Sequence, residues 1–503
     1  MEIFPSSSSY CLFTLLLLAP LLLSLKLLYY SRMGRKKEDQ IRLPPGPWQL
    51  PIIGSLHHVL MKRGQPVHRI MANLAQQCNA PVMHLRLWEL SLVVISSAEA
   101  AREVLKTHDV TFATRAMSLT VKATIGDKLG LFFLPYGAVW REFRKICNVE
   151  LLSTNRVRSF RPIREDEAAR LVSDIVARSQ QSQALLPGGG GGLVDLSECV
   201  ARLVSDSALR AIMGDQFRWR DEFLDTVAMT YKKATGFRIA DLFPSSRVMR
   251  ALSGTVAEAK QYNAKLFDLV DRAIHQHEER KMEAAVADSD TTKQTPDLLD
   301  VLLNIHKEDD PASSLTTASI KAVILDIFVA GSTATSSVIQ WAMLELMRNP
   351  RVLQKAELEV RHVLRGKAKV TENDLIDLKY LKNVIKETLR LHPAPPLPIP
   401  KECQESCKIL GYDVPRGTMV FVNSWAIGRD QSYWVDEPQV FKPERFDASA
   451  VDFKGTVSSP LGLGEGFVRA LCLLMHTSNL YLPHFSTTST GTSHLVSRQT
   501  CST

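Results

Sequence analysis

Helical periodicity dominates the chain after residue 54. Apolar residues recur at three- and four-residue intervals in long stretches, most clearly at residues 97–108, 319–350 and 381–393. Alternating apolar runs typical of strands are few and short, at residues 82–88, 91–96 and 418–423. We therefore predict a mainly α fold with a small β-sheet subdomain (α+β). With 503 residues, the chain is long enough to bury a large core.

An apolar segment near the N-terminus indicates a membrane anchor. Residues 12–30 contain one charged residue, Lys26, and as a helix they would come close to the roughly 30 Å of a bilayer core. A secretory signal peptide is the alternative, but the run is too long and no small-residue cleavage site follows. The basic residues Arg32, Arg35, Lys36 and Lys37 come after it. We predict a single-pass transmembrane helix with the body of the protein in the cytosol.

The rest of the chain divides into three parts. Residues 31–54 form a basic and proline-rich hinge, residues 55–456 the main domain, and residues 457–503 an aberrant tail. The chain has 61 Lys and Arg residues against 53 Asp and Glu residues, and the excess is spread along the sequence. This distribution suits a surface that meets anionic lipid or an acidic protein partner, and we expect no nucleic acid binding.

One charged pair stands out by its context. Glu387 and Arg390 lie three residues apart, on one face of a predicted helix, and a Pro-Glu-Arg-Phe segment follows at residues 443–446. The same Glu-x-x-Arg spacing occurs at three other places, which we interpret as solvated helix pairs: Glu99/Arg102, Glu167/Arg170 and Glu345/Arg348.

The order of these motifs resembles a known family. WREFRKIC, a long helix containing Ala330-Gly331, KETLRLHP and FKPERF follow one another as they do in the cytochrome P-450 superfamily, the haem-thiolate monooxygenases, and specifically in its plant microsomal type. The resemblance implies the P-450 fold, a heme cofactor and the endoplasmic reticulum membrane. It further implies hydroxylation of an apolar plant secondary metabolite, a terpenoid or phenolic, with electrons from a membrane-bound NADPH flavoprotein reductase.

The resemblance also assigns roles to individual residues. Glu387, Arg390 and Arg445 are expected to form a buried structural triad, which is damaging to break because the remaining charge is left uncompensated. Trp140, Arg144 and Lys401 are expected to bind the haem propionates. Lys401 stands where the family often has Arg, so it supplies charge without the planar guanidinium.

The oxygen-activating segment departs from the family pattern. The family has an acid followed by an alcohol after the Ala-Gly pair, and this chain has Thr333 and Ala334 there. We expect Ser332, Thr333 and Thr335 to provide a water-assisted proton relay instead. The predicted substrate wall comprises residues 112–133, 237–244, 328–331 and 397–400.

The axial ligand is the residue that is hardest to assign. The family's loop, Phe-x-x-Gly-x-Arg-x-Cys-x-Gly, does not occur after Thr456, and the nearby candidate is Cys472. A buried apolar cysteine is the competing interpretation. Because the tail is rich in Ser and Thr, we hypothesise that residues after Thr456 are read out of frame. Two other hypotheses stay open: a catalytically inactive relative without the axial thiolate, and a non-haem helical binding protein tethered to the membrane.

Overall fold

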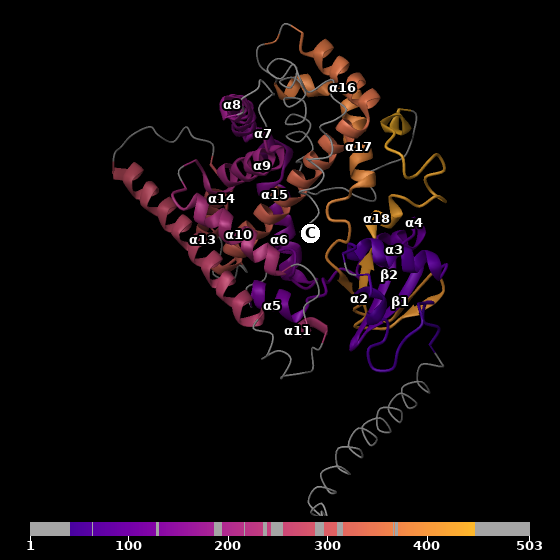
Figure 1. The fold of residues 1–503 in the computed structure, drawn as a ribbon. Helices are drawn as coiled ribbons and strands as arrows, with labels where there is room; N and C mark the ends of the chain where they lie inside the picture. The colour runs from indigo at the N-terminus through magenta and orange to yellow at the C-terminus, as the bar shows by residue number, and fades with distance from the viewer. Residues whose placement is uncertain are drawn as a thin grey trace, which may run out of the picture. The chain divides into compact units, whose positions relative to one another are not determined.

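The structure is a computed structural model that describes residues 41–62, 64–126, 130–185, 194–215, 217–234, 239–242, 255–286, 296–308, 315–365, 367 and 371–447. The predicted anchor at residues 12–30, the first part of the hinge, and the tail with Cys472 lie outside the described residues. The described part is mostly helical with two small sheets (Figure 1), which confirms the predicted fold class. It forms two compact units, one comprising residues up to Phe112 together with Glu402–Phe421, and the other Ala113–Lys401 together with residues from Val422 onward.

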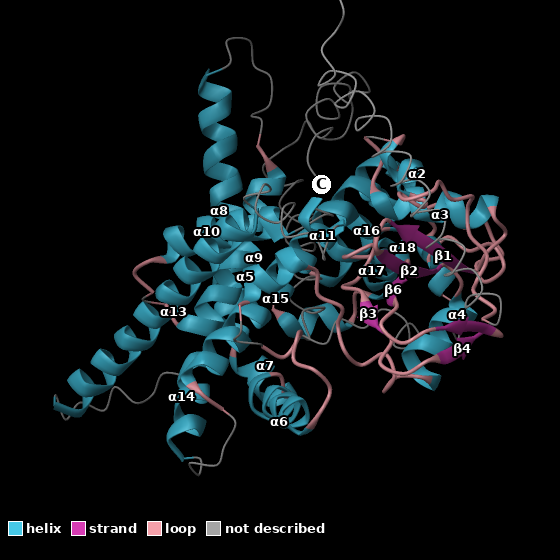
Figure 2. Ribbon diagram, turned by 90° about the horizontal axis from the view of Figure 1, so that it is seen from below, coloured by secondary structure: helices cyan, strands magenta, loops and turns pink. Residues whose placement is uncertain are grey.

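The first unit contains the strands (Figure 2). A four-stranded sheet has the order β1-β2-β6-β3, and a separate hairpin pairs β4 with β5. β1 and β2 are antiparallel, in a register that runs from Val82 opposite Ile95 to Leu87 opposite Leu90. The three predicted strands are confirmed as β1, β2 and β6. The strands are β1 Val82–Leu87, β2 Leu90–Ile95, β3 Lys401–Glu402, β4 Cys407–Ile409, β5 Tyr412–Val414 and β6 Met419–Val422. The helices of this unit are α2 Leu56–Leu60, α3 Val67–Gln77, α4 Ala98–Arg102 and the π-helical turn η1 Glu103–Thr107.

The described part of the proline-rich hinge lies along β1. The His84 N–H donates to the Pro45 carbonyl at 2.9 Å, and the Ser55 N–H donates to the Arg86 carbonyl at 2.6 Å. A side chain at Gly46 would place its Cβ 2.1 Å from the His84 oxygen, so the close approach of the two backbones requires glycine here. Residues from Pro45 onward are therefore part of the folded body.

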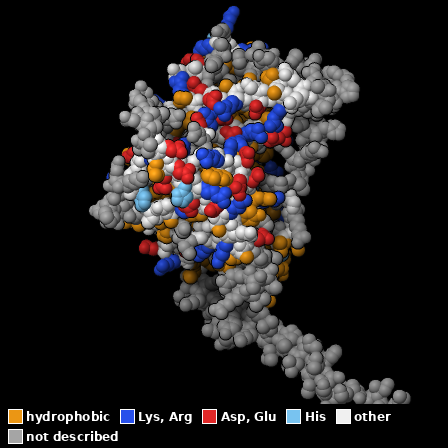
Figure 3. All heavy atoms as spheres, turned by 90° about the vertical axis from the view of Figure 1, so that its left-hand side faces the viewer, with side chains coloured by type: hydrophobic (Ala, Val, Ile, Leu, Met, Phe, Trp, Pro, Cys, Tyr) orange, Lys and Arg blue, Asp and Glu red, His pale blue; other side chains and the backbone are white. Residues whose placement is uncertain are grey.

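The second unit is mostly helical. Its elements are α5 Leu119–Ile125, α6 Ala138–Ile146, η2 Cys147–Leu151, α7 Thr154–Ser159, α8 Arg161–Leu185, α9 Leu196–Met213, α10 Arg220–Ala234, α11 Ile239–Leu242, α13 Thr255–Val286, α14 Leu298–Glu308, α15 Thr317–Arg348, α16 Pro350–Val363, η4 Glu372–Ile376, α17 Lys379–Leu391, α18 Ser424–Ile427 and η5 Pro443–Phe446. Basic and acidic side chains are interspersed over the face of the molecule shown in Figure 3.

The long helix α15 organises this unit. The Thr316 side chain caps it by accepting a hydrogen bond from the Ser319 N–H at 3.2 Å. Its first half packs into a core with α10, α13 and α14, where Phe328 meets Phe223 edge to face at 5.1 Å. Its second half packs into another core with α9, α16 and α17. Among the described helices, α15 alone is long and apolar enough to cross a membrane, yet 44% of its most apolar window is buried inside the protein. Its apolar character is that of a core helix.

Candidate functional site

The predicted triad side chains are in contact, at the junction of α17 and η5. Glu387 and Arg390 form a bidentate pair, with both nitrogen–oxygen distances at 2.7 Å, and neither side chain is exposed to solvent. Arg445 reaches the same carboxylate, with its Nε 3.4 Å from Glu387 Oε1. The Lys442 backbone N–H also donates to this oxygen, at 2.9 Å. Glu387 thus ties α17 to the η5 segment 55 residues later in the chain.

Arg390 uses all of its hydrogen-bond donors. Besides Glu387, its Nη1 donates to the carbonyls of Gly428 and Pro438 at 2.6 and 2.7 Å. Its Nη2 donates to the Val440 carbonyl at 3.2 Å. A guanidinium has five N–H groups in a fixed plane, so one buried side chain organises the whole loop from Gly428 to Val440. Lysine could not replace it, because lysine has three donors and no planar fork.

Two of the three other Glu-x-x-Arg pairs, which we interpreted as solvated helix pairs, contain a buried glutamate. Glu167 is buried and contacts Arg210 at 2.6 Å as well as Arg170 at 3.2 Å. Glu345 is buried and pairs with His392 at 2.8 Å. The prediction of a solvated pair is therefore wrong for both glutamates. Their burial is compensated by partners from distant segments of the chain, which the local Glu-x-x-Arg spacing does not indicate. Glu99 and Arg102 are exposed, as expected.

The predicted propionate ligands lie in two places. Trp140 and Arg144 are one turn apart on α6, with the guanidinium carbon 5.0 Å from the indole ring centroid. Trp140 is half-buried and Arg144 is exposed. Lys401 is half-buried in β3 and forms an antiparallel bridge with Arg115.

Arg115 is a cation that the sequence analysis did not single out. Its Nη1 donates to the Ile399 carbonyl at 3.1 Å, and desolvation lowers the pKa of its guanidinium. Within the described ranges no carboxylate forms an ion pair with it. A desolvated guanidinium without a carboxylate has free donors for an anionic ligand. The signal available in the sequence was a lone arginine within the apolar stretch FATRAM, at residues 112–117.

The three predicted relay hydroxyls of α15 are not brought together. Thr333 shares a half-buried face with Asp326, Ala330 and Ser337, because spacings of four, three and four residues place these positions within about 60° around a helix. Ser332 and Thr335 lie on the other side. The Ser332 hydroxyl is buried and donates to the Phe328 carbonyl at 2.7 Å. Thr335 is half-buried like Thr333. We call the face shared by Asp326, Ala330, Thr333 and Ser337 the open face of α15, and of the three hydroxyls Thr333 alone lies on it.

Two carboxylates attach the predicted substrate wall to neighbouring helices. Asp241 of α11 accepts a hydrogen bond from the Thr120 N–H at the start of α5, at 2.8 Å. Asp326 of α15 accepts one from the Phe132 N–H at 3.1 Å. Asp326 was also missed by the sequence analysis, although it is the sole charge between Ala322 and Gln340.

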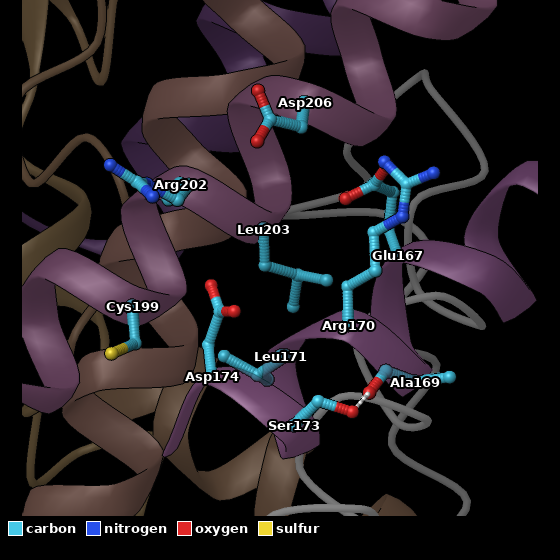
Figure 4. A pocket seen from close by; sticks show the side chains of 10 residues that line it. All are labelled: Glu167, Ala169, Arg170, Leu171, Ser173, Asp174, Cys199, Arg202, Leu203 and Asp206. Atoms are coloured by element: carbon cyan, nitrogen blue, oxygen red, sulfur yellow. Dashed lines mark hydrogen bonds and ion pairs between the residues drawn. The ribbon is translucent and has the colours of Figure 1, made fainter. Parts of the chain in front are cut away.

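A separate cavity of about 400 Å³ lies between α8 and α9 (Figure 4). Leu171 and Leu203 line its apolar part, while charged side chains, including Asp174 and Arg202, surround them. None of the predicted site residues lines this cavity. We therefore keep the candidate site on α15, α6 and the Arg115–Lys401 bridge.

Comparison with protein families gives a match over most of the chain. The family model described as Cytochrome P450 matches residues 44–464, so the match ends before Cys472. The chain is also similar to solved structures of a zebra fish cytochrome P450. The one determined with progesterone has a TM-score of 0.63 and 22% sequence identity, and the alignment covers 83% of this chain and 92% of that one. This likeness concerns the fold.

Curated relatives are considerably closer in sequence. Premnaspirodiene oxygenase of Hyoscyamus muticus is 40% identical over 469 residues, which cover 93% of this chain and 89% of that protein. Ent-isokaurene C2/C3-hydroxylase of Oryza sativa subsp. japonica is 39% identical, with coverage of 89% and 85%. Tabersonine 6,7-epoxidase isoform 1 of Catharanthus roseus is 41% identical, with coverage of 89% and 84%.

Proposed function

Because the chain belongs to the cytochrome P450 family, we propose that it hydroxylates an apolar plant secondary metabolite with electrons from a membrane-bound NADPH flavoprotein reductase. Its class is that of the monooxygenases, and the cofactor is haem. The observation that carries the proposal is the similarity to relatives named for hydroxylation of ent-isokaurene and oxygenation of premnaspirodiene. Plant relatives of this family act on terpenoids and alkaloids, and we propose a terpenoid as the substrate class.

The positive charges described above support a site for the anionic end of a haem. Arg115, Lys401 and Arg144 would supply positive charge to its two propionates, and the Trp140 indole would supply a further donor. When bound, haem supplies the activation of dioxygen. The apolar segments at residues 130–133 and 328–331 would exclude water and orient the substrate. The Thr333 hydroxyl would act as a proton donor on the open face of α15. The Glu387 triad would keep the loop from Gly428 to Val440 in place.

We further propose that residues 12–30 anchor the protein in the endoplasmic reticulum membrane as a single pass, with the body in the cytosol. The basic residues at positions 32–37 support this orientation. A protein anchored in this way would lie beside a membrane-bound reductase, which we propose as the electron donor. The excess of basic residues is suited to an acidic docking surface on that donor.

Oxygen labelling tests the proposed activity. The full-length chain in lipid nanodiscs, supplied with NADPH, a plant flavoprotein reductase and ¹⁸O₂, is expected to add one labelled oxygen atom to a sesquiterpene or diterpene hydrocarbon, as shown by mass spectrometry. A matched reaction with H₂¹⁸O and ordinary dioxygen should leave the product unlabelled. Absence of any oxygenated product across a terpenoid panel would instead support the second candidate function, a catalytically inactive relative. Two observations favour that candidate: Thr333 and Ala334 replace the acid–alcohol pair, and the family match ends before Cys472.

Replacing Arg115 by leucine is expected to weaken haem binding. Hydrogen bonds to charged groups contribute about 1.5–3 kcal/mol, which corresponds to roughly a 10- to 150-fold change in affinity. The rate of haem transfer to apomyoglobin measures this loss directly. Arg86→Leu is the control, because Arg86 is an exposed residue of β1. Equal transfer rates for the two variants would contradict an anion-binding role for Arg115.

A further inference from the structure

Asp326 is a carboxylate in an unusual position. It lies on the open face of α15, where its accessible surface makes it half-buried, yet desolvation by the surrounding protein raises the pKa of its carboxyl group to about 7. Asp326 is therefore a titratable group that is largely surrounded by protein and still has some accessible surface, on the same face of α15 as Thr333.

One of its oxygens is held by a neighbouring segment. The Phe132 N–H donates to Asp326 Oδ2 at 3.1 Å. Gly130 approaches so closely that a Cβ there would lie 2.2 Å from the same oxygen and 2.9 Å from the Ala322 carbonyl. These contacts fix the carboxyl group in place. Oδ1 accepts no hydrogen bond from the described residues.

The surroundings of Asp326 leave it free to exchange a proton. From segment 130–132 the Phe132 N–H favours the charged form, and from η2 the neighbouring titratable group is the thiol of Cys147. Burial and the Asp326 carboxylate raise the pKa of this thiol to about 12, so it stays neutral. No described lysine, arginine or histidine contributes to the pKa of Asp326. A fixed carboxyl group of this kind can hold a proton near neutral pH and release it with a small change in free energy, as a general acid requires.

Asp326 and Thr333 share the open face of α15. Seven residues separate them, two helical turns with a rise of about 10.5 Å, and between them on this face lies the small side chain of Ala330. That span is too long for a direct hydrogen bond, and small side chains leave room for bridging water. Position 333 is where the family pattern has an acid and where this chain has a threonine.

We propose that the carboxyl group of Asp326 is the proton donor that serves the open face of α15, in place of the acid that position 333 lacks. Its Oδ1–H bond breaks as the proton passes to bridging water and along to the Thr333 hydroxyl. The carboxylate is then reprotonated from solvent, so no electrons are exchanged. Asp326 is thus a positioning and proton-supplying residue that acts through Thr333. This inference rests on the proposed monooxygenase function and names a proton source for it.

Infrared difference spectroscopy tests the proton donor without any turnover. A carboxylic acid C=O band that titrates with a midpoint near pH 7 is expected in the full-length protein and should be absent from Asp326→Asn. Thr333→Val removes the hydroxyl at nearly constant shape and is expected to shift the band or its midpoint. Thr335→Val is the matched control, because it makes the same change on the opposite side of α15. No titrating band, or equal effects of the two valine variants, would overturn the proposal.

Turnover provides a second, separable measurement. Product formation by the wild type is expected to fall as pH rises above about 7, because the donor must be protonated. Asp326→Asn should lower the rate about a hundredfold and lose this pH dependence, and Asp326→Asn/Thr333→Asp should recover it by restoring an acid. Glu99→Gln, which changes an exposed carboxylate outside the proposed site, should retain the wild-type pH profile. If the wild type forms no product, the proposed function fails and the infrared result alone decides the role of Asp326.

Discussion

Replacing Glu387 by alanine is expected to lower the free energy of unfolding by about 3–5 kcal/mol, the usual loss when one partner of a buried ion pair is removed. Arg390, fully buried, would lose two of its five hydrogen bonds and keep its charge. Arg445 and the Lys442 N–H would lose their shared acceptor as well. Urea unfolding followed by tryptophan fluorescence measures the change, because Trp434 lies against Arg390, with 5.1 Å between the guanidinium carbon and the ring centroid.

Two further variants make this result specific. Glu99→Ala changes a glutamate with the same Glu-x-x-Arg spacing, but Glu99 is exposed, so the free energy of unfolding should change by less than about 0.5 kcal/mol. Arg445→Gln removes the longer of the two arginine contacts and should be less destabilising than Glu387→Ala. If all three variants unfolded at the same urea concentration, the ion pairs of Glu387 would not stabilise this region.

The triad illustrates how far sequence reasoning reaches. The periodicity of residues 381–393 correctly predicted a helix, and the resemblance identified Arg445 as the third partner. The backbone acceptors could not be predicted, because the carbonyls of Gly428, Pro438 and Val440 come from irregular segments with no periodic signal. The same limitation explains Glu167 and Glu345, since the partners that compensate their burial lie 43 and 47 residues away.

The sequence identified those residues of the candidate site that belong to family motifs, and it did not identify the remaining residues. Trp140, Arg144 and Thr333 were identified from motifs, whereas Arg115 and Asp326 required the structure. Each of these two is a lone charge in an apolar stretch, a pattern that fits a snorkelling surface residue as well as a functional one. Two observations separate these cases: no carboxylate among the described residues forms an ion pair with Arg115, and Asp326 is desolvated although it keeps some accessible surface.

Thiolate ligation of haem is expected to depend on Cys472. An axial ligand must ionise readily, and burial raises the pKa of Cys199 and Cys407 and raises that of Cys147 and Cys403 to about 12. These four of the five described thiols, all except the half-buried Cys78, are therefore poor candidates. If the chain binds haem through a thiolate, the reduced, CO-treated protein should show the red-shifted absorption band of that ligation. Cys472→Ser should abolish the band completely, and Cys199→Ser, which changes a buried thiol on α9, should retain it.

The outcome also decides between ligation by the present tail and a change of reading frame. A wild-type chain that takes up haem without the red-shifted band would show that Cys472 is not the ligand and would support the inactive relative. Sequencing the transcript across the Thr456 codon then identifies the cause, because a sequencing error, an insertion or deletion, or a retained intron there would mean that the family's cysteine loop is encoded in another frame. An uninterrupted transcript that encodes the present tail would rule out the frame change. In that case the break in family resemblance after Gly464 is a property of the protein itself, and loss of the thiolate is how this relative lost its oxygen chemistry.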